Sequence, residues 1–530
     1  MRLFLCVFLV LFEVVCSVTR PNIVFILTDD QDVFLNGTGP MSKLRQYVSS
    51  QGATFSNMFV TTPLCCPSRS SILTGQYVHN HKAINNSVDG NCSSPSWQKG
   101  PETQTFVTYL KKSGYTTFFA GKYLNQYGMD ETGGLSHIPP GWDHWNGLKG
   151  NSQYYNYVVS ANGKAEKHGS DYKADYFTDV INRKATDFLN RQLGKSKDEP
   201  FFMMLSTPSC HAPFTPAPQY SQNFSKMSAP RTPSFNTKST DKHWILRQVK
   251  TPMGNASMQW VDDTFRNRWR TLLSVDDMVE NMVTLLEKKN VLNNTYVVYA
   301  SDNGFHLGQF SLPNDKRQFY EFDIRVPLMV RGPGVKPGQR REDLVLNIDL
   351  APTFLDLAGI RPPDFMDGQS FKSALLSPPS GDASRTDFLV EHTGEYDLKQ
   401  PGCPQYDGQP LNNCFPDCVC EDSRNNTYIC VRRVGSTGNL IYCGVSDDEQ
   451  YVEAYDLSSD PNQLKNVAST LSASVLESLE ESLATLATCS GTTCHNVKNI
   501  PHYRKMPQQR NFTDIPLYHR YRGNSASIGV

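Results

Sequence analysis

The chain has 530 residues, a formal net charge of -1 and 38% hydrophobic residues. A chain of this length and composition buries a large core, which excludes a disordered protein and predicts two domains or one large domain with a smaller appendage. The near-zero charge excludes a global attraction to nucleic acid or to an anionic membrane, so local cations must hold any anionic substrate.

Residues 1–18 have the pattern of a secretory signal peptide. Met1 and Arg2 precede an apolar run over residues 3–15, which Glu13 alone interrupts, and the expected cleavage site follows. No later apolar run reaches membrane-spanning length, so we expect a soluble mature protein that passes through an oxidising compartment. Asn-x-Ser/Thr sequons on both halves of the chain agree with this route: Asn36, Asn85, Asn91, Asn223, Asn255, Asn293, Asn425 and Asn511.

Short apolar runs alternate with helical patterns between residues 19 and 380. Continuous apolar runs suit strands covered on both faces, and apolar residues at three- and four-residue spacing indicate helices. The expected elements are, in chain order, a strand at 23–28, helices at 41–50, 105–112 and 174–193, a strand at 201–205, a helix at 265–289 and a strand at 296–301. The alternation predicts an α/β domain with a large mixed or mostly parallel sheet sandwiched by helices. The Pro-, Ser- and Thr-rich stretch 212–242 is expected to be a long surface excursion over the site.

Two adjacent cysteines stand where a helix is expected to begin. Residues 63–75 read Pro-Leu-Cys-Cys-Pro-Ser-Arg-Ser-Ser-Ile-Leu-Thr-Gly. Pro67 fits the first turn of a helix that Gly75 ends, which places Cys65 at the positive N-terminus. That position lowers a thiol pKa and suits binding of a sulfate or phosphate. From Cys65-Cys66 alone, a structural disulfide is the more common explanation and a reactive thiol is the alternative.

Polar residues follow directly after two of the predicted strands. Asp29 and Asp30 follow the first strand, and Asp302 and Asn303 follow the strand at 296–301. Each of these residue pairs, taken alone, more often forms a turn than a metal site. In a parallel sheet, however, both pairs reach the edge where ligands bind, and their hard oxygen atoms suit Ca²⁺ or Mg²⁺ better than zinc.

The sequence pattern of the chain changes after residue 380. Short β-like runs at 428–433, 440–443 and 451–457 alternate with turns and precede an amphipathic helix at 472–486. Residues 381–530 are therefore expected to form a smaller α+β subdomain with an antiparallel sheet and a terminal helix. Its cysteines favour disulfides over a metal site: Cys403, Cys414, Cys418, Cys420, Cys430, Cys443, Cys489 and Cys494.

The cysteine segment resembles the sulfatase active-site signature, with Cys65 as the first cysteine of Cys-x-Pro-Ser-Arg and with Thr74-Gly75 after it. Other matches follow in family order: Pro21-Asn22-Ile23-Val24 before Asp29-Asp30, Gly114-Tyr115-Thr116-Thr117 before Gly121-Lys122, His211-Ala212-Pro213, Ser301-Asp302-Asn303-Gly304, Lys316 with Tyr320-Glu321, and Arg325-Val326-Pro327. The chain is thus identified as a member of the sulfatases, with an alkaline phosphatase-like fold. Segments 118–125, 308–313 and 414–422 resemble N-acetylglucosamine-6-sulfatases more than arylsulfatases.

The resemblance implies a modified nucleophile and a metal. Cys65 would be converted by the formylglycine-generating enzyme in the endoplasmic reticulum to formylglycine, whose hydrated gem-diol attacks sulfur. One Ca²⁺ would stabilise this diol and polarise a sulfate oxygen. Its implied ligands are Asp29, Asp30, Asp302, Asn303 and the formylglycine oxygen of residue 65.

The same resemblance implies roles for the cations. Arg69 would hold the diol, and Lys122 and Lys316 would neutralise the non-bridging sulfate oxygens. His211 would protonate the departing sugar oxygen, with Lys316 as its competitor, and Asp302 would take the proton of the attacking hydroxyl. Without the family, Lys122 is more often a solvated charge, and His211 before Ala-Pro is more often structural.

Asn125 departs from the family pattern. Many sulfatases have a histidine at this place, and asparagine cannot act as a base, which leaves open which residue assists breakdown of the sulfated intermediate. His306, His79 and His81 lie near the motifs but are weaker candidates.

The cysteine count also implies a free thiol. Of 14 cysteines, Cys6 and Cys16 leave with the signal peptide. Oxidation of the signature cysteine would leave Cys66, Cys92 and Cys210 in the N-terminal part, and at least one thiol of the mature chain is expected to be free.

The expected function is removal of the 6-O-sulfate from N-acetylglucosamine at the non-reducing end of heparan sulfate and keratan sulfate. A sulfatase of other specificity, a phosphoester hydrolase on the same fold and an inactive glycan-binding protein are the alternatives. Phosphoester hydrolases usually have Thr or Ser in place of Cys65, and an inactive relative would be expected to lack Cys65 or a metal ligand, none of which is missing. We expect a lysosomal protein, with secretion as an alternative, a homodimer as one option, and no nucleic-acid partner.

Overall fold

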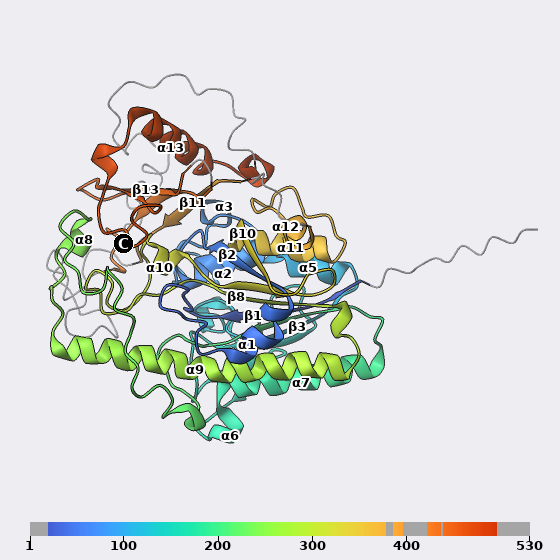
Figure 1. The fold of residues 1–530 in the computed structure, drawn as a ribbon. Helices are drawn as coiled ribbons and strands as arrows, with labels where there is room; N and C mark the ends of the chain where they lie inside the picture. Colours follow the sequence, from blue (N-terminus) through green and yellow to red (C-terminus); the bar gives the residue numbers. More distant parts are fainter. Residues whose placement is uncertain (1–19, 378–384, 396–420, 436–437, 496–530) are drawn as a thin grey trace, which may run out of the picture.

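The computed structural model describes residues 20–377, 385–395, 421–435 and 438–495 (Figure 1). The predicted signal peptide and the predicted domain boundary at residue 380 lie outside these residues. So do the sequon Asn511 and four of the C-terminal cysteines: Cys403, Cys414, Cys418 and Cys420.

A mixed sheet of ten strands crosses the centre of the molecule in the order β10-β2-β9-β8-β1-β7-β3-β4-β5-β6 (Figure 1). The strands are β1 Asn22–Thr28, β2 Ala53–Phe59, β3 Thr116–Gly121, β4 His144–Leu148, β5 Val158–Ala161, β6 Lys164–Lys167, β7 Phe201–Ser206, β8 Thr295–Ser301, β9 Leu328–Arg331 and β10 Gln339–Leu346. β8, β1, β7 and β3 are neighbours and run parallel. Antiparallel pairs occur where β9 lies between β2 and β8, and at the β4-β5-β6 edge. The three strands predicted from apolar runs are thus adjacent and parallel, as expected.

Helices cover both faces of this sheet (Figure 1). One face packs against α2 (Cys65–Thr74), α5 (Phe106–Lys112) and α11 (Leu350–Leu357), and the other against α1 (Ser42–Tyr47), α7 (Phe177–Lys195) and α9 (Asn255–Lys288). Along β1, Phe25 points into the first of these cores and Val24 into the second. Because alternate side chains of a strand point to opposite faces, a strand covered on both sides is apolar throughout. The predicted helix-covered sheet is confirmed.

The shorter helices are α3 Val78–His81, α4 Pro95–Lys99, α6 Tyr172–Asp175, α8 Trp244–Arg247, α10 Glu321–Ile324 and α12 Lys372–Leu376. The helix predicted at 174–193 is α7, and α6 is a separate turn before it. The stretch 212–242 contains one short 3-10 turn, Pro218–Tyr220, and most of its side chains are exposed or half-exposed.

The longest helix, α9, begins ten residues earlier than its aliphatic pattern predicted. Its first turns do not cover the sheet. Val261, Phe265 and Trp269 instead pack in a separate cluster with Phe305 and Leu307. The aliphatic periodicity therefore marks the part of α9 that contacts the sheet, and not the whole helix.

A second, antiparallel sheet has the order β11-β12-β13-β14, and α13 (Ala473–Leu486) packs on it (Figure 1). Its strands are β11 Asp387–His392, β12 Tyr428–Arg433, β13 Leu440–Val445 and β14 Val452–Asp456. The predicted antiparallel sheet and terminal helix are confirmed, whereas β11 was not predicted.

Three disulfides are present in the described residues: Cys66–Cys92, Cys430–Cys443 and Cys489–Cys494. Cys65 and Cys210 are free and buried. The disulfide explanation of the cysteine pair therefore holds for Cys66, whereas Cys65 forms no disulfide. The predicted free thiol is Cys210. None of the helices in the described ranges combines the length and apolar character that crossing a bilayer requires.

Candidate active and metal site

The predicted site residues meet at one edge of the main sheet, beyond the carboxyl ends of its central parallel strands. Asp29 and Asp302 directly follow β1 and β8, and Lys122 directly follows β3. His211 lies on the loop after β7, and Cys65 begins α2. Parallel pairing brings all these strand ends to the same edge, which is where open α/β sheets bind ligands.

Carboxylate and amide groups form the buried part of the site. Asp302 Oδ1 accepts a hydrogen bond from the Asp30 amide at 3.0 Å, and Asn303 Nδ2 donates to Asp30 Oδ1 at 2.8 Å. Asp29, Asp302 and Asn303 are 0% exposed. Asn303 Oδ1 is buried and has no hydrogen-bond partner. Buried polar atoms are normally paired, so this oxygen is open for a ligand.

Cys65 lies against the same carboxylates. Its Sγ is 3.6 Å from Asp29 Oδ1 and 3.9 Å from Asp30 Oδ1. The ligand atoms of Asp29, Asp30, Cys65 and His211 all lie within 4.8 Å of one another. Burial raises the pKa of the Cys65 thiol, although Lys122 opposes this effect. The expected lowering by the helix N-terminus is therefore wrong, because complete burial beside two carboxylates outweighs it.

Arg69, on the second turn of α2, reaches three strand ends. Its Nε donates to Asp302 Oδ2 at 2.7 Å, and Nη1 donates to the Lys122 carbonyl at 2.8 Å and to Ser206 Oγ at 2.7 Å. Its Nη2 lies 3.6 Å from Asp29 Oδ2 and has no hydrogen-bond partner. This guanidinium therefore keeps one buried donor open inside the site.

The two predicted lysines pair with the two neighbouring aspartates. Lys122 Nζ lies 2.7 Å from Asp29 Oδ2, and Lys316 Nζ lies 2.8 Å from Asp30 Oδ2. Burial lowers the pKa of Lys316, but Asp30 outweighs burial and raises it well above its usual value. Lys316 is thus held in its charged form beside the helix start, and the ion pair with Asp29 holds Lys122 there.

The carboxylates of the site differ in their affinity for protons. Burial would raise the pKa of Asp29, but Lys122 and the other cations hold it well below its usual range. Burial is also outweighed at Asp30, chiefly by Lys316, and the pKa of Asp30 is lowered. Burial and the charge of Asp29 raise the pKa of Asp302 despite Arg69. Two firmly ionised carboxylates therefore stand beside a third that binds a proton more readily.

His211 lies on the more open side of the site. Its side chain is 13% exposed, compared with 1% for Asp30, and its Nε2 is 3.9 Å from Asp30 Oδ2. Nδ1 lies 2.7 Å from the Ala212 carbonyl, so it carries a hydrogen and donates there. Burial lowers the pKa of His211, and Asp29 and Asp30 partly oppose this. Nε2 is thus the nitrogen that faces the carboxylates.

Three serines of the site were not predicted. Ser206, at the end of β7, accepts from Arg69, and the hydroxyl of Ser152 donates to Asp29 Oδ2. The Ser68 hydroxyl donates to the Asp302 carbonyl. Ser206 has a signal in the sequence, since it ends an apolar run as the predicted ligands do. Ser152 lies in a loop without such a pattern.

The weaker candidates lie in other networks. His306 contacts Asp323 and Glu421, and His79 contacts Glu391. His81 lies beside Ser71. Asn125 is 5% exposed, and its Oδ1 has no hydrogen-bond partner.

The donor set fits a hard divalent cation. Asp29, Asp30 and Asp302 offer carboxylate oxygens, and the amide oxygen of Asn303 is buried without a partner at the same place. Ca²⁺ and Mg²⁺ take such oxygen ligands, whereas zinc prefers nitrogen and sulfur.

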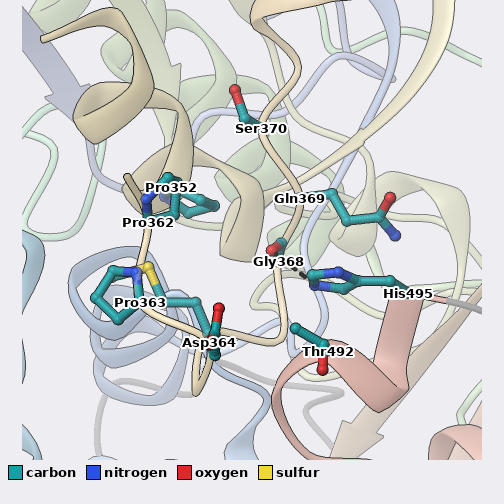
Figure 2. A pocket seen from close by; sticks show the side chains of 10 residues that line it. Pro352, Pro362, Pro363, Asp364, Gly368, Gln369, Ser370, Thr492 and His495 are labelled. Atoms are coloured by element: carbon teal, nitrogen blue, oxygen red, sulfur yellow. Dashed lines mark hydrogen bonds between the residues drawn. The ribbon is translucent and has the colours of Figure 1, made fainter. Parts of the chain in front are cut away.

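A separate cavity of about 250 Å³ lies between the loop around Pro363 and the 3-10 helix Gly491–His495 (Figure 2). His495 Nε2 lies 3.1 Å from the Gly368 carbonyl at its wall. The predicted catalytic and metal-binding residues are not among those that line it.

Comparison with known proteins was made by sequence and by structure. The family profile described as Sulfatase matches residues 21–360. An N-acetylglucosamine-6-sulfatase of Capra hircus is 52% identical over 493 residues, which cover 92% of this chain and 87% of the relative. An N-acetylglucosamine-6-sulfatase of Homo sapiens is 52% identical over 489 residues, covering 91% of this chain and 87% of the relative.

A solved structure described as a complex with its substrate, D-glucosamine-2-N,6-O-disulfate, superposes with a TM-score of 0.72. It is 24% identical in sequence, and the match covers 91% of this chain and 99% of that chain. At this identity the likeness establishes the fold alone.

Proposed function

The chain belongs to the sulfatase family, whose members hydrolyse sulfate esters, and from that premise we propose that it removes the 6-O-sulfate from N-acetylglucosamine at the non-reducing ends of heparan sulfate and keratan sulfate. The specificity is supported by the goat and human relatives, both described as N-acetylglucosamine-6-sulfatases at 52% identity. The reaction type is supported by the residues at the sheet edge.

One observation carries the catalytic assignment. Arg69 Nη2 and Asn303 Oδ1 are both buried in the same cluster without a hydrogen-bond partner. An unpaired buried polar atom costs about 1–3 kcal/mol, and two such atoms of opposite character in one polar cluster indicate that ligands complete their hydrogen bonding. A sulfate oxygen or a diol oxygen would pair with the guanidinium, and a cation would pair with the amide oxygen.

We propose that Asp29, Asp30, Asp302, Asn303 and residue 65 hold one Ca²⁺. When bound, the ion supplies a Lewis acid that polarises an oxygen of the reacting groups. Asp29 and Asp30 now neutralise Lys122 and Lys316. Both ammonium groups lie beside residue 65, where they would neutralise the non-bridging sulfate oxygens on which charge develops in the transition state.

We propose that Cys65 is converted to formylglycine by the formylglycine-generating enzyme. The unmodified thiol is a poor nucleophile here, because burial raises its pKa and the thiolate is the reactive form. The hydrated aldehyde supplies a hydroxyl group as the nucleophile at the same position. α2 adds a favourable field, because its N-terminus is positive toward the anionic sulfate.

His211 is the better candidate to protonate the departing sugar oxygen. Its Nδ1 donates to the Ala212 carbonyl, which leaves Nε2 to hold the transferable proton. A bound sulfate ester brings negative charge to this nitrogen and favours its protonated form. Lys316 holds its proton more firmly, because Asp30 raises its pKa, and is therefore the weaker acid.

We also propose the secretory route to the lysosome and the division into a signal peptide, a catalytic domain over 19–380 and a subdomain over 381–530. The disulfide Cys66–Cys92 supports passage through an oxidising compartment. The sequon asparagines Asn36, Asn223, Asn255 and Asn293 are exposed and accessible to glycosylation, whereas Asn85 is 7% exposed.

The test combines mass spectrometry with sulfate release. In protein purified from secretory cells, the peptide over residues 63–75 is expected to carry formylglycine at position 65. The same protein should release sulfate from N-acetylglucosamine-6-sulfate oligosaccharides faster than from other sulfated sugars or an aryl sulfate. Active protein with unmodified Cys65 would contradict the mechanism, and preference for another ester would contradict the specificity.

A further inference from the structure

Lys316 lies between two residues with unusual backbone conformations. Asp315 has φ 123° and Arg317 has φ 96°, and neither is glycine. Residues other than glycine rarely adopt such φ angles. Each such residue costs about 1–3 kcal/mol of folding free energy and keeps its conformation only where surrounding contacts hold it. The placement of Lys316 at the site therefore depends on whatever holds its two neighbours.

Arg317 pairs locally with Asp315 through Nη1, and its other contacts are with residues at the ends of strands of the second sheet. Its Nε and Nη2 donate to Glu395 Oε2 at 2.8 and 2.6 Å, just beyond β11. Its carbonyl accepts from Asn426 Nδ2 at 3.1 Å and from the Tyr428 hydroxyl at 3.0 Å, at the start of β12. The Arg317 and Glu395 side chains are 11% and 5% exposed, so water does not replace these contacts.

The same carboxylate is also connected to the nucleophile helix. Glu395 Oε1 accepts from the Asn86 amide at 3.1 Å, and Asn86 Oδ1 accepts from the Cys66 amide at 2.9 Å. One oxygen of Glu395 thus holds the segment that carries Lys316, and the other holds the loop that contacts the start of α2.

We propose that Arg317 and Glu395 are positioning residues that set the distance between Lys316 Nζ and the reactive group at residue 65. Neither group contacts the cluster of Asp29 and Asp30 in the contacts described. Arg317 therefore acts through Lys316, and Glu395 acts both through Lys316 and through the Asn86 loop at the start of α2. A misplacement of about 1 Å at a charge-stabilising group can cost about 100-fold in rate. This inference rests on the role of Lys316 in the proposed function.

Glu395→Gln tests the proposal with little change of shape. Glutamine has one acceptor oxygen, so it can keep the contact with Arg317 or the contact with Asn86 but not both. We expect kcat to fall about 10-fold or more while KM changes by less than about 3-fold. In the Lys316→Ala background the same substitution should lower kcat by a clearly smaller factor than in the wild type, because the part of its effect that passes through Lys316 is absent.

Asp387→Asn is the matched control. Asp387 forms a buried pair with Arg433 at 2.6 Å within the same sheet, with side chains 6% and 11% exposed. Its loss should lower the melting temperature without lowering kcat of the folded enzyme. Binding of inorganic sulfate by calorimetry gives a second measurement, in which Glu395→Gln and Lys316→Ala should weaken affinity non-additively.

Equal losses from Glu395→Gln with and without Lys316 would overturn the proposal, and so would a kcat loss of the same size in Asp387→Asn. Rates are compared on whichever sulfate ester the wild-type enzyme hydrolyses fastest. A failure to release sulfate from N-acetylglucosamine-6-sulfate residues would therefore overturn the proposed specificity, while this comparison still decides the positioning role.

Discussion

Arg69 joins strand ends that are distant in sequence. One guanidinium donates to Asp302 after β8, to the Lys122 carbonyl after β3 and to Ser206 at the end of β7. A lysine could not make this set, because its three donors leave from a single nitrogen. The fork of Arg69 thus joins these strand ends while its Nη2 has no hydrogen-bond partner.

Arg69→Lys is expected to keep the positive charge and lose this geometry. We expect kcat to fall about 100-fold or more, as on removal of one donor to a developing oxyanion. The measurement is kcat together with the formylglycine content of residue 65, so that a failure of modification is recognised. Arg361→Lys, at a side chain that is 85% exposed, is the control. A nearly normal rate in fully modified Arg69→Lys would exclude the proposed role.

The adjacent cysteines should separate activity from stability. Cys65→Ala removes the proposed nucleophile and no disulfide, so activity should vanish while the melting temperature stays near that of the wild type. Cys66→Ala opens the bond to Cys92, which spans 26 residues, and should cost about 2–4 kcal/mol of stability. Calorimetry and sulfate release on both variants check this contrast. Residual sulfatase activity in Cys65→Ala would contradict the mechanism.

The strands that carry the site could be predicted because their apolar runs stop at the ligands. Asp29 and Asp302 directly follow β1 and β8, and parallel pairing brings them to one edge. The pairings themselves could not be predicted: Asn303 and Asp30 are hydrogen-bonded although 273 residues separate them. Ser152 also had no signal, because a loop serine looks the same whether or not it donates to a buried carboxylate.

Removal of the metal should lower the thermal stability of the protein, and Asn303, close after β8, should contribute to this effect. If Asn303 Oδ1 is a ligand, chelation of Ca²⁺ should lower the melting temperature of the wild type, because a ligand at about 100 times its Kd stabilises by about 2.7 kcal/mol. Asn303→Ala should reduce this chelator-dependent shift. Thermal unfolding with and without chelator measures it independently of activity. An undiminished shift in Asn303→Ala would remove this residue from the ligand set.

The two sheets share a continuous interior. The rings of Phe59 on β2 and Phe388 on β11 are 5.1 Å apart, and both belong to one apolar core. Buried ionic contacts cross the same junction, including Arg432 with Glu321 at 2.9 Å. The sequence predicted the second sheet but not these contacts, because each joins residues far apart in the chain. Apolar and ionic contacts together therefore fix how the two sheets pack.

His79 makes this junction sensitive to pH. Its Nδ1 lies 2.9 Å from Glu391 Oε1, and its Nε2 lies 2.9 Å from the Cys489 carbonyl and 3.2 Å from Asn80 Nδ2. His79 can donate to both oxygen atoms at once only as the charged imidazolium. Burial would lower the pKa of His79, but the Glu391 carboxylate outweighs burial and raises it. The folded protein therefore holds this proton more tightly than the unfolded chain does.

The sign of the pH dependence follows from this raised pKa. The stabilisation is complete below the ordinary histidine value of 6.5 and is lost as pH rises through the higher folded value. His79→Gln should thus cost about 2 kcal/mol near pH 5 and less near pH 9, measured by denaturant unfolding. His144→Gln is the control, because burial lowers the pKa of His144 and the folded protein favours its neutral form. The loss of stability caused by His144→Gln should therefore grow as pH rises, opposite to the trend expected for His79→Gln. A cost of His79→Gln that is independent of pH would mean that the junction does not bind this proton, and its stability would then rest on packing alone.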